Sequence, residues 1–271
     1  MKYDVAQFSK TVTAYWKKEG RHQLPWRLTR DPYAILVSEI MLQQTQVDRV
    51  VPYFESWMRK FPTVQSLAKA PLVDVLRAWS GLGYNRRAKL LRECAKEIVE
   101  RYGGKVPRDF AALVALPGIG PYTAGAISAF VFDEPAVFIE TNIRAALLHH
   151  FFPRSRKVED KKLIPILKRC LKHTTSARKW YSALMDYGSY IKRTTDNPSR
   201  RSKHHVRQSK FAGSLRQARG AILRKLLKGP ISEKALLKVD VVSSYKIELA
   251  LRDLEREGLV RKTSSKWKLA N

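Results

Sequence analysis

Apolar residues recur at intervals of three and four along most of the chain, and no stretch before residue 255 alternates as a half-buried strand would. This spacing predicts a mostly helical protein. A first helix is expected from residue 32 to about residue 43 and a second from residue 45. Further helices are expected near residues 72–79, 86–101, 109–115, 122–131, 141–150, 160–172 and 176–191.

Two helix starts have recognisable signals. Asp31 before Pro32 fits an N-cap followed by proline in the first turn. Thr45 and Asp48 have the spacing of a capping box, with aspartate in the acidic place. Gln43 and Gln44 are therefore expected at a junction between two helices.

The C-terminal pattern is different. A short helix is expected at residues 232–238 and a longer one at residues 243–257, followed by a hairpin over residues 259–269. Helices followed by a hairpin predict a winged helix, which often lays its second helix in the major groove of DNA. Because that helix carries several acids (Glu248, Asp253, Glu255 and Glu257), both DNA contact and a protein-binding or packing role stay open.

The net charge of the chain indicates a binding partner. The 271 residues contain 52 Lys+Arg against 24 Asp+Glu, a net charge of +28, which favours a polyanion and most commonly nucleic acid. Residues 192–228 hold twelve of these bases and one acid. We expect a basic linker there that leads into a helix, with Arg200, Arg201 and Lys203 on phosphates. The alternative is a solvated linker.

Other classes are disfavoured. No apolar run approaches the roughly 18 residues that cross a bilayer, and the opening residues lack the apolar core of a secretory signal. We expect a soluble intracellular protein, in the cytoplasm or nucleoid, with no membrane partner. Cys94 and Cys170 alone cannot supply a Cys₄ zinc site or a cubane iron–sulfur cluster. We therefore expect neither metal nor other cofactor.

A glycine-rich segment, LPGIGPYTAGA over residues 116–126, predicts a phosphate site. Gly118 and Gly120 allow positive φ and close approach to a ligand, and prolines fix the flanking φ values. A helix then begins, with Thr123 in its first turn. Its exposed amides attract phosphate oxygens and position a protein on DNA without reading the sequence.

Two carboxylates are candidates for chemistry. Glu39 shares a helical face with apolar neighbours such as Ile35 and Leu36, and burial raises a carboxyl pKa as a general acid near neutral pH requires. The alternative is a salt bridge to an arginine such as Arg27. Glu140 precedes another helix, where an acid could equally serve the helix dipole.

Such a pair suits glycosidic cleavage, because one acid protonates the leaving group while an anion supports the oxocarbenium-like sugar. A nucleobase on DNA is one such leaving group. Reaching it requires base flipping and side chains that fill the vacated stack. Gln43, Gln44 and the segment Gly81–Tyr84, which includes Leu82, are the candidates. An ordinary turn with a core tyrosine is the alternative for that segment.

At this point five motifs identify a family resemblance. In order they are LPW (24–26), SEIMLQQTQV (38–47), GLGYNRRA (81–88), LPGIGPYTAGAI (116–127) and ALMDYGS (183–189). Over about residues 5–192 the chain resembles the catalytic domain of MutY-type adenine DNA glycosylases, in the helix-hairpin-helix superfamily that includes endonuclease III. The implied fold is mostly α, with two helical lobes and a small C-terminal winged-helix-like α+β module.

The resemblance implies domain bounds and residue roles. The DNA-binding lobe would cover about residues 28–137 and the second lobe residues 1–27 plus 138–195, followed by a basic linker (196–215) and the module (216–271). Glu39 matches the general acid, Asn142 an active-site asparagine, Arg27 a base-pocket residue, Gln44 and Tyr84 residues inserted at the lesion, and Gly118 and Gly120 the phosphate hairpin.

Tyr122 lies where lyase-competent relatives carry a Schiff-base lysine. Because imine formation requires an amine, tyrosine favours hydrolysis without strand cleavage. Three departures stand beside this match. Glu140 replaces the family's oxocarbenium-stabilising aspartate, the four cluster cysteines are absent with Lys192 near the first, and a short module stands in place of the NUDIX-like domain.

We therefore expect a monomeric, monofunctional, cluster-free glycosylase in base excision repair. Its partner would be double-stranded DNA with a mismatch or lesion, and its target adenine opposite G or 8-oxoguanine. One alternative is a mismatch thymine or uracil glycosylase, which shares the scaffold and the tyrosine, although EIMLQQT favours adenine. The other is a DNA-binding protein whose catalysis is impaired by Glu140.

Overall fold

The structure is a computed structural model that describes residues 4–206, 210–239 and 241–270. Its described residues divide into two compact units. Unit 1 lies within residues 1–39, 107–115 and 119–207, and unit 2 within residues 40–106, 116–118 and 208–271. This division differs from the expected lobes, since the helices on both sides of the glycine-rich hairpin fall in unit 1 and the C-terminal module falls in unit 2.

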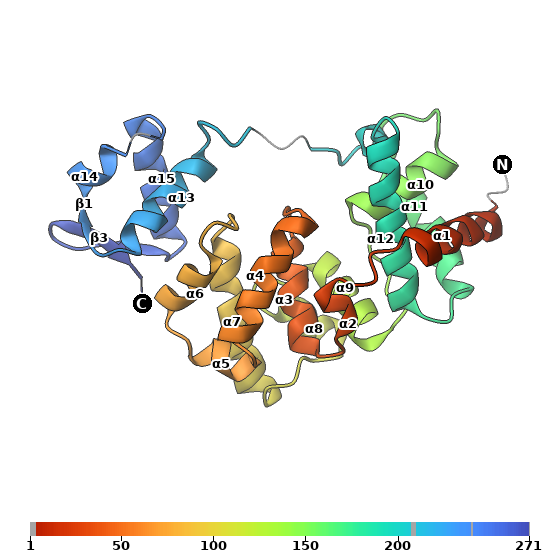
Figure 1. Ribbon diagram of the computed structural model, residues 1–271, viewed down its shortest axis with the longest axis horizontal. Coiled ribbons are helices and arrows are strands. Elements are labelled where there is room, and N and C mark those ends of the chain that lie inside the picture. The colour runs from red at the N-terminus through yellow and green to blue at the C-terminus, as the bar shows by residue number, and fades with distance from the viewer. Residues whose placement is uncertain (1–3, 207–209, 240, 271) are drawn as a thin grey trace. The chain divides into compact units, whose positions relative to one another are not determined.

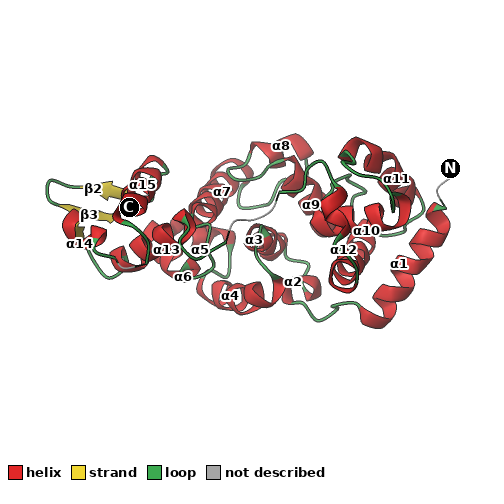
Figure 2. Ribbon diagram, turned by 90° about the horizontal axis from the view of Figure 1, so that it is seen from above, coloured by secondary structure: helices red, strands yellow, loops and turns green. Residues whose placement is uncertain are grey.

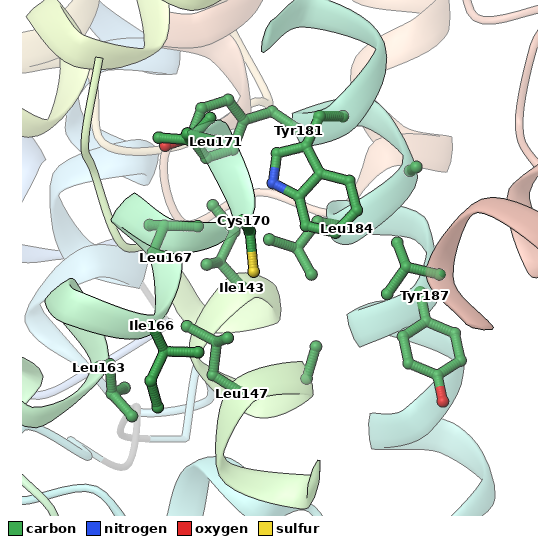
Figure 3. Close-up of a cluster of buried hydrophobic side chains, with 14 of the residues drawn as sticks. Ile143, Leu147, Leu163, Ile166, Leu167, Cys170, Leu171, Tyr181, Leu184 and Tyr187 are labelled. Atoms are coloured by element: carbon green, nitrogen blue, oxygen red, sulfur yellow. The ribbon is translucent and has the colours of Figure 1, made fainter. Parts of the chain in front are cut away.

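Unit 1 is helical (Figure 1). Its elements are α1 (Val5–Glu19), α2 (Pro25–Leu28), the start of α3 (Pro32–Leu42), α8 (Phe110–Ala115), α9 (Pro121–Phe132), α10 (Thr141–Phe151), α11 (Asp160–Lys172), α12 (Ala177–Thr194) and the 3₁₀ helix η1 (Pro198–Arg201). Side chains from α1, α10, α11 and α12 form its apolar core, where Ile143, Leu167 and Leu184 lie around Cys170 (Figure 3).

A single glycine sets how closely α10 meets α12. A Cβ on Gly188 would lie 2.0 Å from the carbonyl oxygen of Asn142, a distance that no side chain tolerates. Glycine therefore lets α12 lie directly against the first turn of α10. This contact fixes the segment that carries Glu140 and Asn142.

Two helices are buried on every side. Residues 33–41 of α3 and 123–129 of α9 are all buried. A helix that is apolar all round belongs in the interior rather than at a surface. Glu39 therefore lies on an enclosed helix, and the single apolar face expected from the sequence understates its burial.

The two predicted helix starts have different outcomes. Asp31 accepts hydrogen bonds from the amides of Tyr33 (3.0 Å) and Ala34 (3.3 Å), so the expected cap of α3 is confirmed. The capping box at Thr45 is wrong. The next helix, α4 (Val47–Lys60), has Gln46 as its N-cap and no capping side chain among the described residues. The Thr45 hydroxyl instead donates to the carbonyl of Gln43 (3.2 Å).

Unit 2 joins the middle of the chain to the C-terminal module. After α4 come α5 (Val64–Lys69), α6 (Leu72–Trp79) and α7 (Arg86–Tyr102). The module follows with α13 (Leu215–Leu226), β1 (Ile231–Ser232), α14 (Glu233–Leu237), α15 (Ser244–Arg256), β2 (Val260–Lys262) and β3 (Lys266–Leu269).

The module has the winged-helix element order. Its antiparallel sheet has the strand order β1–β3–β2, and Figure 2 shows β2 and β3 next to each other. The predicted hairpin of β2 and β3 is confirmed, with Lys262 opposite Trp267. β1 lies before residue 255 and was not predicted, because no stretch there alternates as a half-buried strand would. It is only two residues long, too short for alternation to appear, and it pairs through Ile231 opposite Trp267.

The segment expected as a linker from residue 196 begins as ordered structure on unit 1. The Ser199 hydroxyl donates to the carbonyl of Thr141 (3.1 Å). Arg201 donates to the carbonyls of Leu148 (3.0 Å) and Pro153 (2.9 Å). Residues 207–209 of the expected linker lie outside the described residues. In the part of the chain that is described, no helix is long and apolar enough to cross a membrane.

Candidate active site

Glu39 is a buried acid that forms no salt bridge with an arginine among the described residues. Its side chain is on α3 and the residue is 9% exposed. Burial, together with the negative charge of Glu140, raises the pKa of Glu39 to about 8, while the charge of Arg27 lowers it. Glu39 is therefore protonated near neutral pH, as a general acid requires.

The expected salt-bridge alternative for Glu39 is wrong. The Arg27 guanidinium binds Asp186 instead, at 2.6 Å from Nη1 to Oδ2 and 3.0 Å from Nη2 to Oδ1. Asp186 also accepts hydrogen bonds from Arg21. Arg27 was predicted to line a base pocket. That role stays a prediction, for a side chain already oriented by Asp186.

Glu140 occupies the first turn of α10. It is the N-cap, and its Oε1 accepts a hydrogen bond from the Ile143 amide at 2.7 Å. Burial raises the pKa of Glu140, whereas that amide and the charges of Lys192 and Arg144 lower it. The expected place of Glu140 at a helix N-terminus is thus confirmed, and these contacts oppose the rise in pKa that burial causes.

Lys192 and Asn142 complete the surroundings of Glu140. The Lys192 ammonium donates to Oδ1 of Asn142 at 3.1 Å. Arg144 is held by Asp160 through two hydrogen bonds of 2.8 and 2.7 Å. Sequence reasoning noted Lys192 only as standing near a missing cysteine and did not single out Arg144. Its position four residues after Glu140 was the available signal.

Tyr122 belongs to the same group. Its ring packs edge-on against Phe138, with centroids 5.6 Å apart. Burial and the negative charges of Glu39 and Glu140 hold the pKa of the Tyr122 hydroxyl well above its ordinary range. The hydroxyl therefore stays neutral and supplies a hydrogen-bond donor. Unit 1 brings together all four predicted catalytic residues, Glu39, Tyr122, Glu140 and Asn142.

The hairpin between α8 and α9 differs from its prediction at one glycine. Gly118 has φ +79°, and a Cβ there would lie 2.9 Å from Cβ of Leu90. Gly120 has φ −90° and is the N-cap of α9. Only Gly118 needs the left-handed conformation. A Cβ on Gly120 would meet no described atom within 4 Å, so that face is open to a ligand.

Thr123 was predicted to contact DNA, but it is only 4% exposed. Its side chain belongs to the interior, so a phosphate would meet its backbone alone. No described side chain caps the start of α9. The helix start stays a predicted phosphate site of the kind that backbone amides form.

The residues predicted to enter the base stack have unusual backbones. Gln44 has φ 54° and Tyr84 has φ 51°, in the left-handed region that non-glycine residues rarely adopt. Such strain gathers at functional sites. Leu82 corrects the prediction. It is 4% exposed, so its side chain packs inside unit 2 and is not available to DNA.

Arg87 holds these two segments together, and sequence reasoning missed it. Its Nη1 donates to the carbonyls of Ile40 (2.8 Å), Met41 (3.0 Å) and Gln43 (2.6 Å). Its Nη2 donates to the carbonyl of Gly83 at 3.1 Å. Arg87 thus satisfies the last carbonyls of α3 and fixes the turn at Gln44. The available signal was its place in GLGYNRRA.

The basic residues after α12 differ in how they are used. Arg201 is held by two carbonyls, and Lys203 pairs with Glu159 at 3.0 Å. Arg200 is exposed. Phosphate binding by these three stays a prediction, and the geometry gives Arg201 a structural role as well.

The residues present do not fit the iron–sulfur cluster that the fold family implies. A cubane cluster needs four thiolates. Cys94 on α7 and Cys170 on α11 are both buried, and burial raises their thiol pKa values to about 12 and about 11. Where the family resemblance places the cluster, the Ser199 and Arg201 hydrogen bonds hold the backbone. No cluster of potential metal-binding side chains was found among the described residues.

A glycine hairpin between helices and a buried acid near a second carboxyl at a helix start are features of a helix-hairpin-helix protein of the base-excision type. Residues 37–173 match the family described as "HhH-GPD superfamily base excision DNA repair protein", and the chain belongs to this family.

Several relatives are named "Adenine DNA glycosylase". One from Mycolicibacterium smegmatis is 33% identical over 269 residues, covering 92% of this chain and 91% of the relative. Another, from Buchnera aphidicola subsp. Baizongia pistaciae, is 35% identical and covers 68% of this chain. The match spans 52% of that relative.

Solved structures show the same fold. A thermostable thymine-DNA glycosylase aligns with a TM-score of 0.59 and 27% identity, over 68% of this chain and 86% of that one. A trapped endonuclease III–DNA covalent intermediate aligns with a TM-score of 0.54 and 18% identity, over 78% and 90%.

Proposed function

We propose that this chain is a monofunctional DNA glycosylase that hydrolyses the N-glycosidic bond of adenine mispaired with G or 8-oxoguanine. The observation that carries this proposal is Glu39, a buried acid with a pKa of about 8 beside Glu140. Few structural roles require a carboxyl that is both enclosed and protonated. General acid catalysis at neutral pH does.

The reaction follows from these groups. Glu39 gives its proton to a ring nitrogen of adenine, and the C1′–N bond breaks with its electron pair going to the base. The Glu140 anion stabilises the oxocarbenium-like sugar. Water adds to C1′ and loses a proton to the Glu39 carboxylate. Tyr122 has no amine, so no imine forms and the strand is not cut.

Adenine is the base that the comparisons favour. Relatives named for adenine excision cover most of the chain at 33% identity, whereas the thymine-DNA glycosylase aligns at 27% over 68%. Impaired catalysis is the weaker alternative, because the Ile143 amide, Lys192 and Arg144 oppose the rise in the pKa of Glu140 that burial causes.

Double-stranded DNA is the proposed partner, bound by a monomer. The net charge of +28 supplies general attraction to phosphates. The open face at Gly120 and the first amides of α9 supply a positioned contact.

A single-turnover base-release assay on A:8-oxoG, A:G, T:G and U:G duplexes, with and without alkali, tests this function. We expect adenine release from the first two and strand breaks only after alkali. Base loss only from T:G or U:G would show the mismatch thymine or uracil activity instead. No base loss from any duplex would indicate a binding protein, and breaks before alkali would contradict monofunctional hydrolysis.

A further inference from the structure

The last turn of α12 carries a lysine to which the proposed chemistry gives no role. Lys192 is partly buried, and its ammonium donates to Oδ1 of Asn142 at 3.1 Å. Lys192 and Arg193 are the basic residues of that turn. A cation at a helix C-terminus commonly serves the helix dipole. Arg193 is exposed and supplies such a cation, so the helix dipole does not explain why Lys192 is bound to Asn142.

The backbones on both sides of this contact are fixed. Lys192 follows Gly188 by four residues, so the two residues share a face of α12. Gly188 lies so close to α10 that a Cβ there would be 2.0 Å from the carbonyl oxygen of Asn142. The Ser199 hydroxyl also donates to the carbonyl of Thr141 at 3.1 Å. Lys192 is therefore held beside the first turn of α10.

The hydrogen bond determines which way the Asn142 carboxamide faces. An ammonium donates and cannot accept, so the carboxamide must present its oxygen to Lys192. The NH2 group of the carboxamide is then left to donate to a substrate. The backbone amide of Asn142 is also one of the groups that lower the pKa of Glu140. Asn142 thus links Lys192 to Glu140.

The charge of Lys192 acts on Glu140 as well. Lys192 and Arg144 are the two cations that lower the pKa of Glu140, and Lys192 has the larger effect. Arg144 is paired with Asp160 through hydrogen bonds of 2.8 and 2.7 Å. Lys192 forms no salt bridge with a carboxylate in the part of the chain that is described. Its charge is therefore the less compensated of the two.

We propose that Lys192 is a positioning residue of the base-excision site, which orients the Asn142 carboxamide toward the substrate and favours the ionised form of Glu140. The inference rests on the proposed function, under which the Glu140 anion stabilises the oxocarbenium-like sugar. A fixed donor and a fixed charge lower a reaction barrier because they need no rearrangement during the reaction. Lys192 supplies both through a single side chain.

The charged and titratable groups around Glu140 come from several helices. They are Lys192 on α12, Arg144 on α10 with its partner Asp160 on α11, Glu39 on α3, Tyr122 on α9, and Arg201 on η1, which contacts the other end of α10. Glu39 and Tyr122 keep their protons well below pH 8. A fall in rate toward acid pH therefore reports on Glu140. Without Lys192 this fall should begin at a higher pH, because the pKa of Glu140 loses the strongest charge that lowers it.

Single-turnover adenine release from A:8-oxoG at saturating enzyme, measured against pH, tests this role in the full chain. Lys192→Met should slow release at neutral pH by about tenfold or more and move the acid-side fall to higher pH. Lys192→Arg keeps a donor and the charge, so it should retain most of the rate and the position of that fall. Arg193→Met, the exposed neighbour, should stay within about twofold. A normal rate and pH profile in Lys192→Met would overturn the proposal. Weaker duplex binding with a normal rate at saturation would also overturn it, because Lys192 would then be a phosphate contact.

Carbon-13 NMR of the glutamate carboxyls gives an answer that does not depend on base release. The signal of Glu140 is assigned by its disappearance in Glu140→Gln. We expect its titration midpoint to move to higher pH in Lys192→Met and to stay in place in Lys192→Arg and Arg193→Met. If the unmodified chain releases no base, the proposed function fails, yet the midpoint still shows whether Lys192 acts on Glu140. An unchanged midpoint in Lys192→Met would contradict the inference whatever the activity.

Discussion

The two carboxyls of unit 1 differ in their surroundings rather than in residue type. Burial and a neighbouring negative charge raise the pKa of Glu39 to about 8, against the opposing charge of Arg27. Burial raises the pKa of Glu140 as well, but there an amide donor and two nearby cations oppose the rise. Environments that separate two carboxyl groups in this way assign one as the acid and the other as the anion.

Glu140→Asp tests how the longer acid is used. Aspartate is a strong N-cap, so α10 should keep its cap and its melting temperature. Because the family carries aspartate there, we expect base release to be preserved or increased. Glu140→Gln keeps the length but removes the charge and should slow release by about 100-fold or more. Single-turnover rates and thermal melts check both.

If Glu140→Asp loses activity while its melting temperature is unchanged, the site is built around the longer side chain. A displacement of about 1 Å can cost on the order of 100-fold in rate.

Sequence reasoning succeeded where the surroundings of a residue are local. The apolar neighbours of Glu39 come from its own helix, so its burial was predictable. Arg87 was not, because its carbonyl partners lie more than forty residues earlier in the chain. Leu82 shows the same limit, since a leucine on a turn can point into the core or out of it, and only tertiary packing decides.

At the scale of elements, α6 and α10–α12 were predicted to within a few residues, whereas α1 (Val5–Glu19), α5 (Val64–Lys69) and β1 were not predicted. β1 has two residues and forms by pairing with β3. The Thr45 hydroxyl donates to the Gln43 carbonyl and accepts a hydrogen bond from Arg87, so it does not cap a helix. A local signal fails where a distant partner takes the same group.

The two hairpin glycines should respond differently to alanine. Gly118→Ala forces a side chain into positive φ and against Leu90, which should cost about 1 kcal/mol or more of folding free energy. Gly120→Ala has room and an ordinary φ, so it should cost less folding free energy than Gly118→Ala, limited to the poorer N-cap that alanine makes. It should weaken DNA binding several-fold by blocking close approach. Urea unfolding and duplex titration check this pair. Equal effects of the two variants on stability would contradict it.

Two neighbouring arginines in the ordered segment after α12, Arg200 and Arg201, can be compared through the same substitution. Arg201→Met leaves the carbonyls of Leu148 and Pro153 without their donor, and we expect a loss of about 1–3 kcal/mol in the free energy of unfolding. Arg200→Met removes the same charge from an exposed position and should cost less than about 0.5 kcal/mol. Urea unfolding of both variants measures the difference. A similar loss in both would remove the structural role given to Arg201.

At the scale of the whole molecule, composition indicated DNA, and the motifs indicated the family and, through it, two lobes, a linker and a module. The hairpin helices belong to the unit of the carboxylates, and the C-terminal module belongs to the unit of Gln44 and Tyr84. From the sequence, the acids on the second helix of the module left both DNA contact and a packing role as possible uses of that helix. Arg219 pairs with one of its acids, Glu257, which uses that carboxylate inside the module.

The central claim is that buried, protonated Glu39 delivers the proton to the base. The most direct measurement is the single-turnover rate of adenine release from A:8-oxoG as a function of pH, for the unmodified chain and for Glu39→Gln. The folded-state pKa of Glu39 is about 8 against an ordinary 4.5, so its proton is present at neutral pH and is lost as pH rises through 8.

We expect the rate to fall about tenfold per pH unit above pH 8, and Glu39→Gln to be slower by about 100-fold or more with no such break. The raised pKa also makes stability depend on pH, because the folded state binds the Glu39 proton more tightly than the unfolded state does. The contribution of protonated Glu39 is fully present below pH 4.5 and is lost as the pH rises through 8. The melting temperature of Glu39→Gln should therefore rise relative to that of the unmodified chain as the pH approaches 9. A rate that stays level through pH 8, or a Glu39→Gln variant that releases adenine normally, would contradict the role of Glu39.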